Sequence, residues 1–374
     1  MPEVNTVKVR TQRQLKQFID FPAKLYADCK CWVPALRGDE FKTFDRQKNE
    51  AFAFCEADCF LAMRGKEVVG RVAAIVNHRA DDADMSARFG WLDFVEDIDV
   101  LRSLMDAVRC WALLRGRKVL KGPWGFTDMD KEGLLVEGYE HLSPFTCLYN
   151  YPYYDIHLAR LGFTKDVDWT QRIMTVSSTM PPMFQYAPLV EERFGIHVVR
   201  PRSMRSLARQ YGKGVFSMYN EAFAPLAGFS PLGDKQISTY LNTYVPLLDK
   251  DFVAVAVDSQ DQPVGFLACI PTLSTAIRRA HGHLSPFGLL HIAHALRQND
   301  TLEALIIGVS PKYQACGVPI LMFKYVHENC VRRGIRRIIL NPQLEENHKV
   351  QNLFNDYDTE PFMRRRAYRM KIID

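Results

Sequence analysis

The residues best suited to chemistry lie where a short apolar run meets a helix, at Gln314-Ala-Cys-Gly317. Residues 305–309 have the composition of a buried strand, and residues 318–333 have the pattern of an amphipathic helix that ends at Gly334. The start of a helix offers backbone N–H groups without intrahelical partners and the positive end of the helix dipole. After a loop that contains glycine, this combination suits a phosphate or pyrophosphate. Many turns of this kind bind nothing, so the pattern alone is weak.

The loop resembles the pyrophosphate loop of the GNAT superfamily of acyl-CoA N-acyltransferases, whose pattern is Gln or Arg, two residues, Gly, one residue, then Gly or Ala. Gln314 and Gly317 match this pattern, and Pro319 departs from it. Proline has no N–H, so one possible phosphate donor is lost, although proline fits the first turn of a helix. The resemblance implies that acetyl-CoA or another acyl-CoA binds at Gln314, Ala315, Cys316, Gly317 and Val318.

The same resemblance implies cofactor contacts on the strand before the loop and on the last helix. Pantetheine is expected to pair with the strand at Ile307, Gly308 and Val309, where a backbone N–H near Val309 would polarise the thioester carbonyl. Asn347 resembles the asparagine that opens the last helix of the family and reaches the cofactor. A plain buried strand would have the same composition, so the strand assignment depends on the loop.

Direct attack of an amine on a thioester needs a base, and it benefits from an acid near the leaving thiolate. Glu303, at the head of the strand, matches where such enzymes often place a base; the alternatives are a solvated glutamate, or Glu345 and Glu346. Many relatives carry a tyrosine seven residues after the asparagine, where this chain has Phe354. Tyr357 is our candidate for the acid, with Tyr368 and water as alternatives.

The chain repeats the same order of elements. Residues 58–75 and 251–270 both have the pattern of a β-hairpin, with turns at Gly65 and at residues 258–262. Helices are predicted at 101–115 and 318–333, and final helices at 153–161 and about 347–356. This alternation predicts an α/β fold with a mixed sheet and helices on its faces.

The first copy lacks the phosphate loop. Where the second half has Tyr313-Gln-Ala-Cys-Gly-Val, the first has Phe94-Val-Glu96-Asp97-Ile-Asp99. Carboxylates at a helix start satisfy its free N–H groups and repel a pyrophosphate. The first half is therefore expected to be degenerate for cofactor binding.

Longer segments extend the resemblance over nearly the whole chain, to bacterial tandem-GNAT proteins. They include Gly122-Pro-Trp-Gly-Phe126, Tyr149-Asn-Tyr-Pro-Tyr-Tyr154 and Leu161-Gly-Phe163. With a composition break at residues 177–183, they imply two GNAT-like domains, at residues 1–180 and 195–374.

Composition fits an ordinary globular protein, with 47% hydrophobic and 24% charged residues and a net charge of +5. No apolar stretch approaches the roughly 20 residues that span a bilayer, and the N-terminus lacks a signal-peptide core. Nine cysteines fit reduced thiols and a cytoplasmic location. The pairs Cys29-x-Cys31 and Cys55-x-x-x-Cys59 fit buried packing better than zinc, and no metal is expected.

We therefore expect an N-acyltransferase that moves an acyl group from acyl-CoA to a primary amine, on a small molecule or peptide, in a ternary complex. The alternative is a non-catalytic acyl-CoA sensor, which Phe354 and Pro319 favour. No membrane partner is expected, and nucleic acid is a third, weaker interpretation of the arginine run 364–366. The sequence leaves the acceptor, acyl chain length and oligomeric state open.

Overall fold

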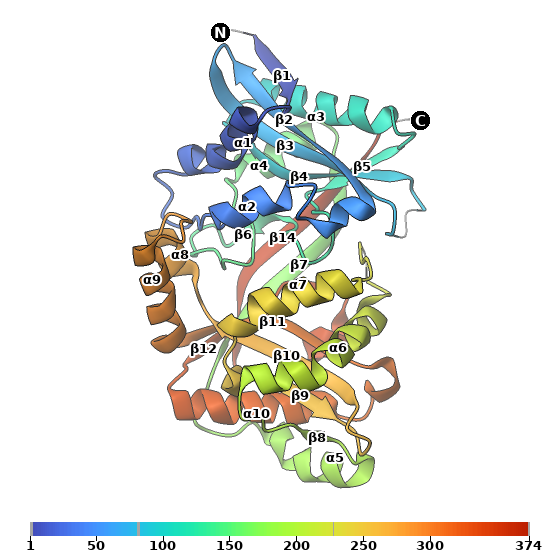
Figure 1. Ribbon diagram of the computed structural model, residues 1–374, viewed down its shortest axis with the longest axis vertical. Helices are drawn as coiled ribbons and strands as arrows, with labels where there is room; N and C mark the ends of the chain where they lie inside the picture. Colours follow the sequence, from blue (N-terminus) through green and yellow to red (C-terminus); the bar gives the residue numbers. More distant parts are fainter. Residues whose placement is uncertain (1–2, 81–82, 227, 373–374) are drawn as a thin grey trace. The chain divides into compact units, whose positions relative to one another are not determined.

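The computed structural model describes residues 3–80, 83–226 and 228–372 of the chain (Figure 1). The chain divides into two compact units. Unit 1 comprises Met1–Thr170, Leu273–Ile292 and Met363–Asp374, and unit 2 comprises Gln171–Thr272 and Ala293–Phe362. The predicted bounds 1–180 and 195–374 follow the sequence repeat. The compact units also exchange segments, because a strand at the end of each half pairs within the other unit.

Unit 1 contains a mixed sheet in the order β1-β2-β3-β4-β5-β14. Strands β4 and β5 are parallel, and the other neighbours are antiparallel. The elements are β1 (Val4–Lys8), α1 (Gln12–Leu25), α2 (Arg37–Thr43), η1 (Glu50–Ala53), β2 (Cys55–Arg64), β3 (Glu67–Asn77), β4 (Ser86–Phe94), α3 (Ile98–Leu113), β5 (Val119–Gly122), β6 (Leu134–Glu137), α4 (Tyr153–Arg160), α8 (Ser274–Arg279), and parts of β7 (Thr164–Thr175), α9 (Pro286–Arg297) and β14 (Thr359–Lys371).

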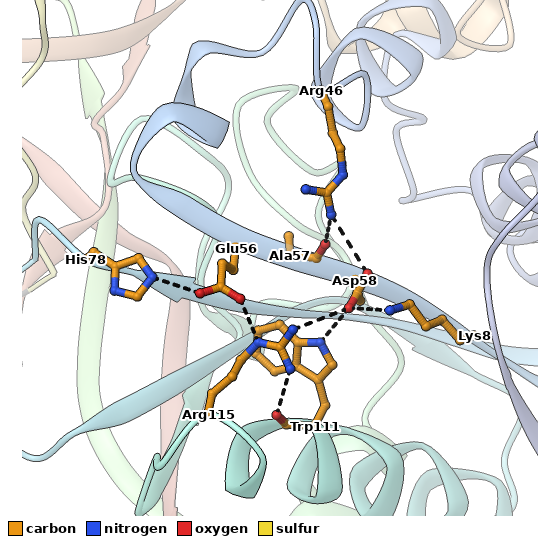
Figure 2. Close-up of polar contacts among 8 residues, drawn as sticks. All are labelled: Lys8, Arg46, Glu56, Ala57, Asp58, His78, Trp111 and Arg115. Carbon is orange, nitrogen blue, oxygen red and sulfur yellow. Dashed lines mark hydrogen bonds and ion pairs between the residues drawn. The ribbon is translucent and has the colours of Figure 1, made fainter.

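Helix α3 packs on the sheet of unit 1 through residues spaced three and four apart, including Val100, Leu104 and Val108, which are fully buried. Polar contacts fix its last turns (Figure 2). The indole N–H of Trp111 donates to Asp58 Oδ2 at 2.7 Å, and Arg115 Nε donates to Glu56 Oε2 at 2.9 Å. Both acceptors lie on β2, so the C-terminal end of α3 is held against that strand.

Unit 2 repeats this plan in the order β8-β9-β10-β11-β12-β7, with β11 and β12 parallel. Residues 173–175 of β7 supply the strand beside β12. The other elements are η2 (Pro182–Tyr186), α5 (Ala187–Phe194), β8 (His197–Val198), α6 (Met204–Phe223), α7 (Asp234–Tyr244), η3 (Val245–Leu247), η4 (Lys250–Phe252), β9 (Val253–Val257), β10 (Pro263–Pro271), β11 (Thr301–Val309), η5 (Pro311–Tyr313), α10 (Val318–Arg333), β12 (Arg337–Ile339), β13 (Gln343–Leu344), α11 (His348–Gln351) and η6 (Asn352–Phe354).

The predicted mixed sheet and repeated order of elements are confirmed. Helix α10 has the predicted bounds and ends at Gly334, which is left-handed with φ of 71°. Helix α3 begins at Ile98, three residues before the prediction, because Asp97 caps it there. The last helix is shorter than predicted: α11 gives way to the 3-10 turn η6, where Asn352 and Asn355 are poor helix formers and Phe354 is buried against Phe323.

The arginine runs of the sequence form internal ion pairs. Arg364 and Arg366 both donate to the buried carboxylate of Asp168, and Arg369 lies 3.2 Å from Asp84. In unit 2, Arg332 and Arg333 bind Asp251 at 3.0 and 2.9 Å. Internal carboxylates therefore pair with Arg364 and Arg366 of the run 364–366, which the sequence offered as a nucleic-acid contact.

Candidate functional site

Strand β11 leaves one of its edges open in unit 2. It pairs with β10 along most of its length, from Leu302 to Val309. On the other side, β12 pairs only with residues Thr301, Leu302 and Glu303. From Ala304 to Val309, no strand in the described part of the chain covers that second edge.

The hydrogen-bond pattern shows which backbone groups face the open edge. Ser310 N donates to Val264 O at 2.9 Å, so these residues form a hydrogen-bonded antiparallel pair. Because such pairs alternate along the ladder, the N–H and C=O of Val309 and of Ile307 point away from β10. Gly308 is needed between them, since a Cβ there would lie 2.5 Å from the ring of Phe266. The open edge therefore presents the N–H that the resemblance assigns to the thioester carbonyl.

The loop after β11 leads directly into the start of α10. Tyr313 N donates to Ser310 O at 2.8 Å, and Cys316 N donates to Tyr313 O at 3.0 Å, which makes a tight turn. The hydroxyl of Tyr313 also donates to Asp258 at 3.1 Å and so fixes the turn to the β9–β10 hairpin. Gly317 is left-handed, with φ of 75°, and a Cβ on it would lie 2.9 Å from Val190 of α5. Glycine is therefore required at this position.

The N-terminus of α10 has no side-chain cap, because its N-cap residue is Gly317. Within the described part of the chain, the backbone N–H groups of Ala315, Gly317 and Val318 donate no hydrogen bond to another residue. Pro319 is in the first turn and contributes no N–H. Three unused donors at the positive end of a 16-residue helix form an arrangement that suits an anion.

Lys312 adds a cation beside this loop, and the sequence reasoning had overlooked it. Its ammonium lies 5.1 Å from the centre of the Tyr313 ring and is exposed. Gln314 and Ala315 are also exposed. The outer part of the loop is thus exposed, with a positive charge at its edge, whereas Val318 at the helix start is fully buried.

The equivalent strand edge in unit 1 is closed by tyrosines. Gly70 pairs with Phe94 as Gly265 pairs with Val309, so Phe94 occupies the place of Val309. The N–H of Phe94 donates to the hydroxyl of Tyr154 at 3.1 Å, and the hydroxyl of Tyr153 donates to the C=O of Phe94. Both tyrosines belong to the run 149–154, which resembles the tandem-GNAT proteins, but the sequence did not predict that they contact Phe94.

The helix start in unit 1 is closed by a carboxylate. Asp97 is the N-cap of α3, and its side chain accepts a hydrogen bond from Asp99 N at 2.8 Å. Arg64 pairs with the same carboxylate. Burial acts to raise the pKa of Asp97, but hydrogen bonds from Asp99 N and Arg64 lower it overall. The predicted capping is confirmed for Asp97.

Glu303, the candidate base, is 1% exposed and lies in β11 between Ile270 of β10 and Ile339 of β12. Its carboxylate accepts a hydrogen bond from the hydroxyl of Thr272. The alternative of a solvated glutamate is therefore wrong, because almost none of the residue is exposed. Its catalytic role stays a prediction.

Two of the remaining candidates, Asn347 and Tyr357, lie in the C-terminal part of unit 2. Asn347 caps α11, where its side chain accepts from Val350 N at 3.4 Å. Tyr357 packs against Phe354, Phe323 and His327, and burial raises the pKa of its hydroxyl. Tyr368 lies in unit 1, where it donates to Asp155. Tyr357 thus lies in an apolar cluster that stabilises the protonated form of its hydroxyl.

Other features of the chain add no second candidate. All nine cysteines are free thiols, and Cys316 packs on the apolar core of unit 2. No group of three or more His, Cys, Asp or Glu among the described residues is arranged to hold a metal. Two hollows, of about 370 and 290 Å³, are lined by residues such as Phe184 and Lys324, or Pro246 and Lys250, and neither includes the loop 314–318.

Solved structures define the class of fold. A tandem GNAT protein from the clavulanic acid biosynthesis pathway, without acetyl-CoA, matches with a TM-score of 0.58 and 14% identity, over 100% of this chain and 99% of that one. A probable N-acyltransferase from Enterococcus faecalis V583 matches with a TM-score of 0.51 and 9% identity, over 99% and 72%. The chain therefore has the tandem GNAT fold, as the sequence predicted.

Two relatives are similar in sequence along almost the whole chain. Protein YghO of Escherichia coli K12 is 25% identical over 374 residues, covering 96% of this chain and 94% of the relative. The bacterial ceramide synthase of Caulobacter vibrioides is 23% identical over 376 residues, covering 98% and 97%. No protein-family model matches the chain.

Proposed function

We propose that unit 2 transfers an acyl group from acyl-CoA to a primary amine. One contrast supports this most strongly. The open strand edge at Val309 and the uncapped start of α10 at Gly317 are available in unit 2, whereas Tyr154 and Asp97 occupy the equivalent places in unit 1. The family resemblance implies that acyl-CoA uses this strand edge and this helix start together.

In the proposed reaction the amine nitrogen attacks the thioester carbonyl carbon, the new C–N bond forms, the C–S bond breaks, and the leaving coenzyme A thiolate takes up, directly or through water, the proton that the nitrogen loses. The N–H of Val309 stabilises the oxyanion that forms on the carbonyl oxygen. The free and accessible amides at Ala315 and Gly317, with Lys312 nearby, hold the pyrophosphate at the positive end of α10. Glu303 is the candidate base that accepts the proton from the ammonium.

The test is release of free coenzyme A thiol from acetyl-CoA and from longer acyl-CoA, measured across a panel of amines. Amine-dependent release is the expected result. Release that no amine accelerates, although acyl-CoA raises the melting temperature, would support the sensor instead. Phe354 favours this second candidate, because it is buried where many relatives carry the tyrosine that donates to the thiolate, and Tyr357 beside it is only partly buried in the same apolar cluster.

We further propose a long-chain amino alcohol as the acceptor class. The support is the similarity to a protein named bacterial ceramide synthase over 98% of this chain, since a ceramide is an N-acylated long-chain amino alcohol. Sphinganine should then accelerate thiol release more than a short amino alcohol such as ethanolamine. Equal rates with both amines, or a preference for ethanolamine, would refute this acceptor while leaving the transferase proposal intact.

A further inference from the structure

The segment between β10 and β11 forms a separate pair of helices, α8 and α9 (Figure 1). Its position is fixed by backbone contacts. Arg37 N donates to Gly282 O at 3.0 Å, and a Cβ on Gly282 would lie 2.4 Å from Ala35 O. A Cβ on Gly288 would lie 2.2 Å from His283 O, so the turn before α9 packs closely on the helix. The side chains around this turn are therefore held in place.

Large apolar side chains of this segment point into solvent. Leu284 is 48% exposed, Phe287 77%, Leu289 52% and Leu290 66%. In the first turns of α9, only Gly288 and Ile292 are buried. Single exposed apolar residues are ordinary, but four within seven positions of one segment form a continuous apolar surface that needs an explanation.

The charged side chains of the segment are all basic. From Gln262 to Asn299 the sequence contains no aspartate or glutamate. Arg278 and Arg279, at the end of α8, are exposed, as are His281, His283 and His291. Exposed leucine and phenylalanine beside arginine and histidine, without acids among them, are typical of helices that lie in a membrane interface.

We propose that this surface, made of Arg278, Arg279, Leu284, Phe287, Leu289 and Leu290, binds the face of a bilayer that contains anionic lipids. The apolar side chains enter the boundary between headgroups and acyl chains, and the arginines meet the lipid phosphates. An anionic bilayer fits both chemistries at once, whereas an acidic protein would have to supply a matching apolar groove. The inference rests on exposure and charge, and it is independent of which amine is acylated.

Surface attachment of this kind requires no spanning helix. Among the described residues, no helix combines the length and the apolar character needed to cross a membrane. The sequence predicts no membrane partner, and the interfacial contact proposed here departs from that expectation. Attachment through one short segment is reversible and weakens at high salt.

The test is sedimentation of the full-length protein with vesicles of phosphatidylcholine, with or without phosphatidylglycerol. Binding to the mixed vesicles, weakened by salt, is the expected result. The double variant Phe287→Ser and Leu290→Ser should bind at least about tenfold more weakly. Replacing Arg278 and Arg279 with serine should weaken binding about fivefold per arginine.

Leu114→Ser is the matched control, because Leu114 is 86% exposed and lies at the C-terminal end of α3. It should bind the vesicles as the wild type does, and all variants should keep the wild-type melting temperature. The proposal would be overturned if the wild type did not bind mixed vesicles, or if Leu114→Ser lost as much binding as the α9 variant. Capture of an acidic protein without vesicle binding would overturn it equally.

Discussion

At the scale of single residues, the two halves differ in whether a few backbone amides are occupied. Phe94 and Val309 are at equivalent positions in the two units. The N–H of Phe94 is hydrogen-bonded to the hydroxyl of Tyr154, whereas the N–H of Val309 faces the open edge. At the start of α3, the carboxylate of Asp97 accepts a hydrogen bond from the N–H of Asp99. A site for an anionic thioester can thus be closed by side chains alone, with the backbone plan unchanged.

Gly317 tests the loop, and Gly334 at the other end of α10 is its matched control. Both are left-handed, with φ of 75° and 71°, so alanine costs similar backbone strain at each, about 1 kcal/mol. Only Gly317→Ala also meets Val190, which would displace the amides of the loop. We expect Gly317→Ala to weaken acetyl-CoA binding about tenfold by thermal shift, since one lost hydrogen bond to a charged group is worth about 1.5–3 kcal/mol. Equal binding by the two variants would contradict the assignment.

Glu303→Gln tests the candidate base. The amide keeps the volume of the side chain and still accepts from Thr272, but it cannot take a proton. We expect amine-dependent thiol release to fall about 10²- to 10⁴-fold, while acyl-CoA binding is unchanged. A rate within threefold of the wild type, with binding intact, would remove Glu303 from the mechanism.

The position of the loop was predictable from the sequence because the pattern that predicts it is local. Gln314, Gly317 and the following helix pattern are contiguous, and the structure places them at a strand end and helix start as expected. The pair of hydrogen bonds by which Tyr153 and Tyr154 close the strand edge at Phe94 was not predictable. It joins residues about 60 positions apart, and a tyrosine run has the same appearance whether it packs or closes a site.

At the scale of elements, the open edge results from where two parallel strands stop pairing. β12 covers β11 only as far as Glu303, and β10 alone continues to Val309. The corresponding pair in unit 1, β4 and β5, also stops after three residues, at Arg88 and Lys121. Hydrophobic patterning predicted a strand at residues 305–309, within β11, but it does not show where two paired strands separate.

Tyr154→Phe tests whether the closure in unit 1 is structural. Its hydroxyl contacts Phe94 N at 3.1 Å and the hydroxyl of Tyr26 at 2.8 Å, and the residue is fully buried. Removal leaves the buried N–H of Phe94 without a partner, whereas Tyr26 keeps its hydrogen bond to Asp93, so we expect a loss of about 1–3 kcal/mol in unfolding free energy. Acetyl-CoA binding should not change. Tyr186→Phe, at an exposed tyrosine, should have no effect on stability, and similar losses in both variants would refute the interpretation.

At the scale of the whole molecule, each compact unit includes chain from both sequence halves. Residues 363–374 complete the first unit, and residues 171–175 begin the second. The sequence repeat predicts two similar halves, and it does so correctly for the order of elements. It cannot show that the last strand of each half is exchanged, because an exchanged strand has the same composition and pattern as one that stays in place.

Asp168→Asn tests the ion pairs that hold the C-terminal strand in unit 1. Burial acts to raise the pKa of Asp168, but hydrogen bonds from Arg366 and Arg364 outweigh it and lower the pKa to about 2. The ionised form therefore stabilises the fold at neutral pH by roughly 2–3 kcal/mol. This stabilisation is complete above about pH 4 and is lost as pH falls towards about 2.

The measurement is the urea midpoint of Asp168→Asn and of wild type at pH 7 and pH 3. The variant should be less stable at pH 7, and the difference should narrow at pH 3, where the wild-type carboxylate begins to be protonated. Asp106→Asn, at an exposed aspartate on α3, should match the wild type at both values. A difference that stays constant with pH would show that the carboxylate charge is not responsible.

Amide hydrogen exchange with and without saturating acetyl-CoA tests the central claim most directly, because the claim concerns particular N–H groups. Exchange should slow in residues 305–320, which include the amides of Val309, Gly317 and Val318, and stay unchanged in residues 94–100 of unit 1. Protection of residues 94–100, or no protection in residues 305–320 despite binding, would contradict the account.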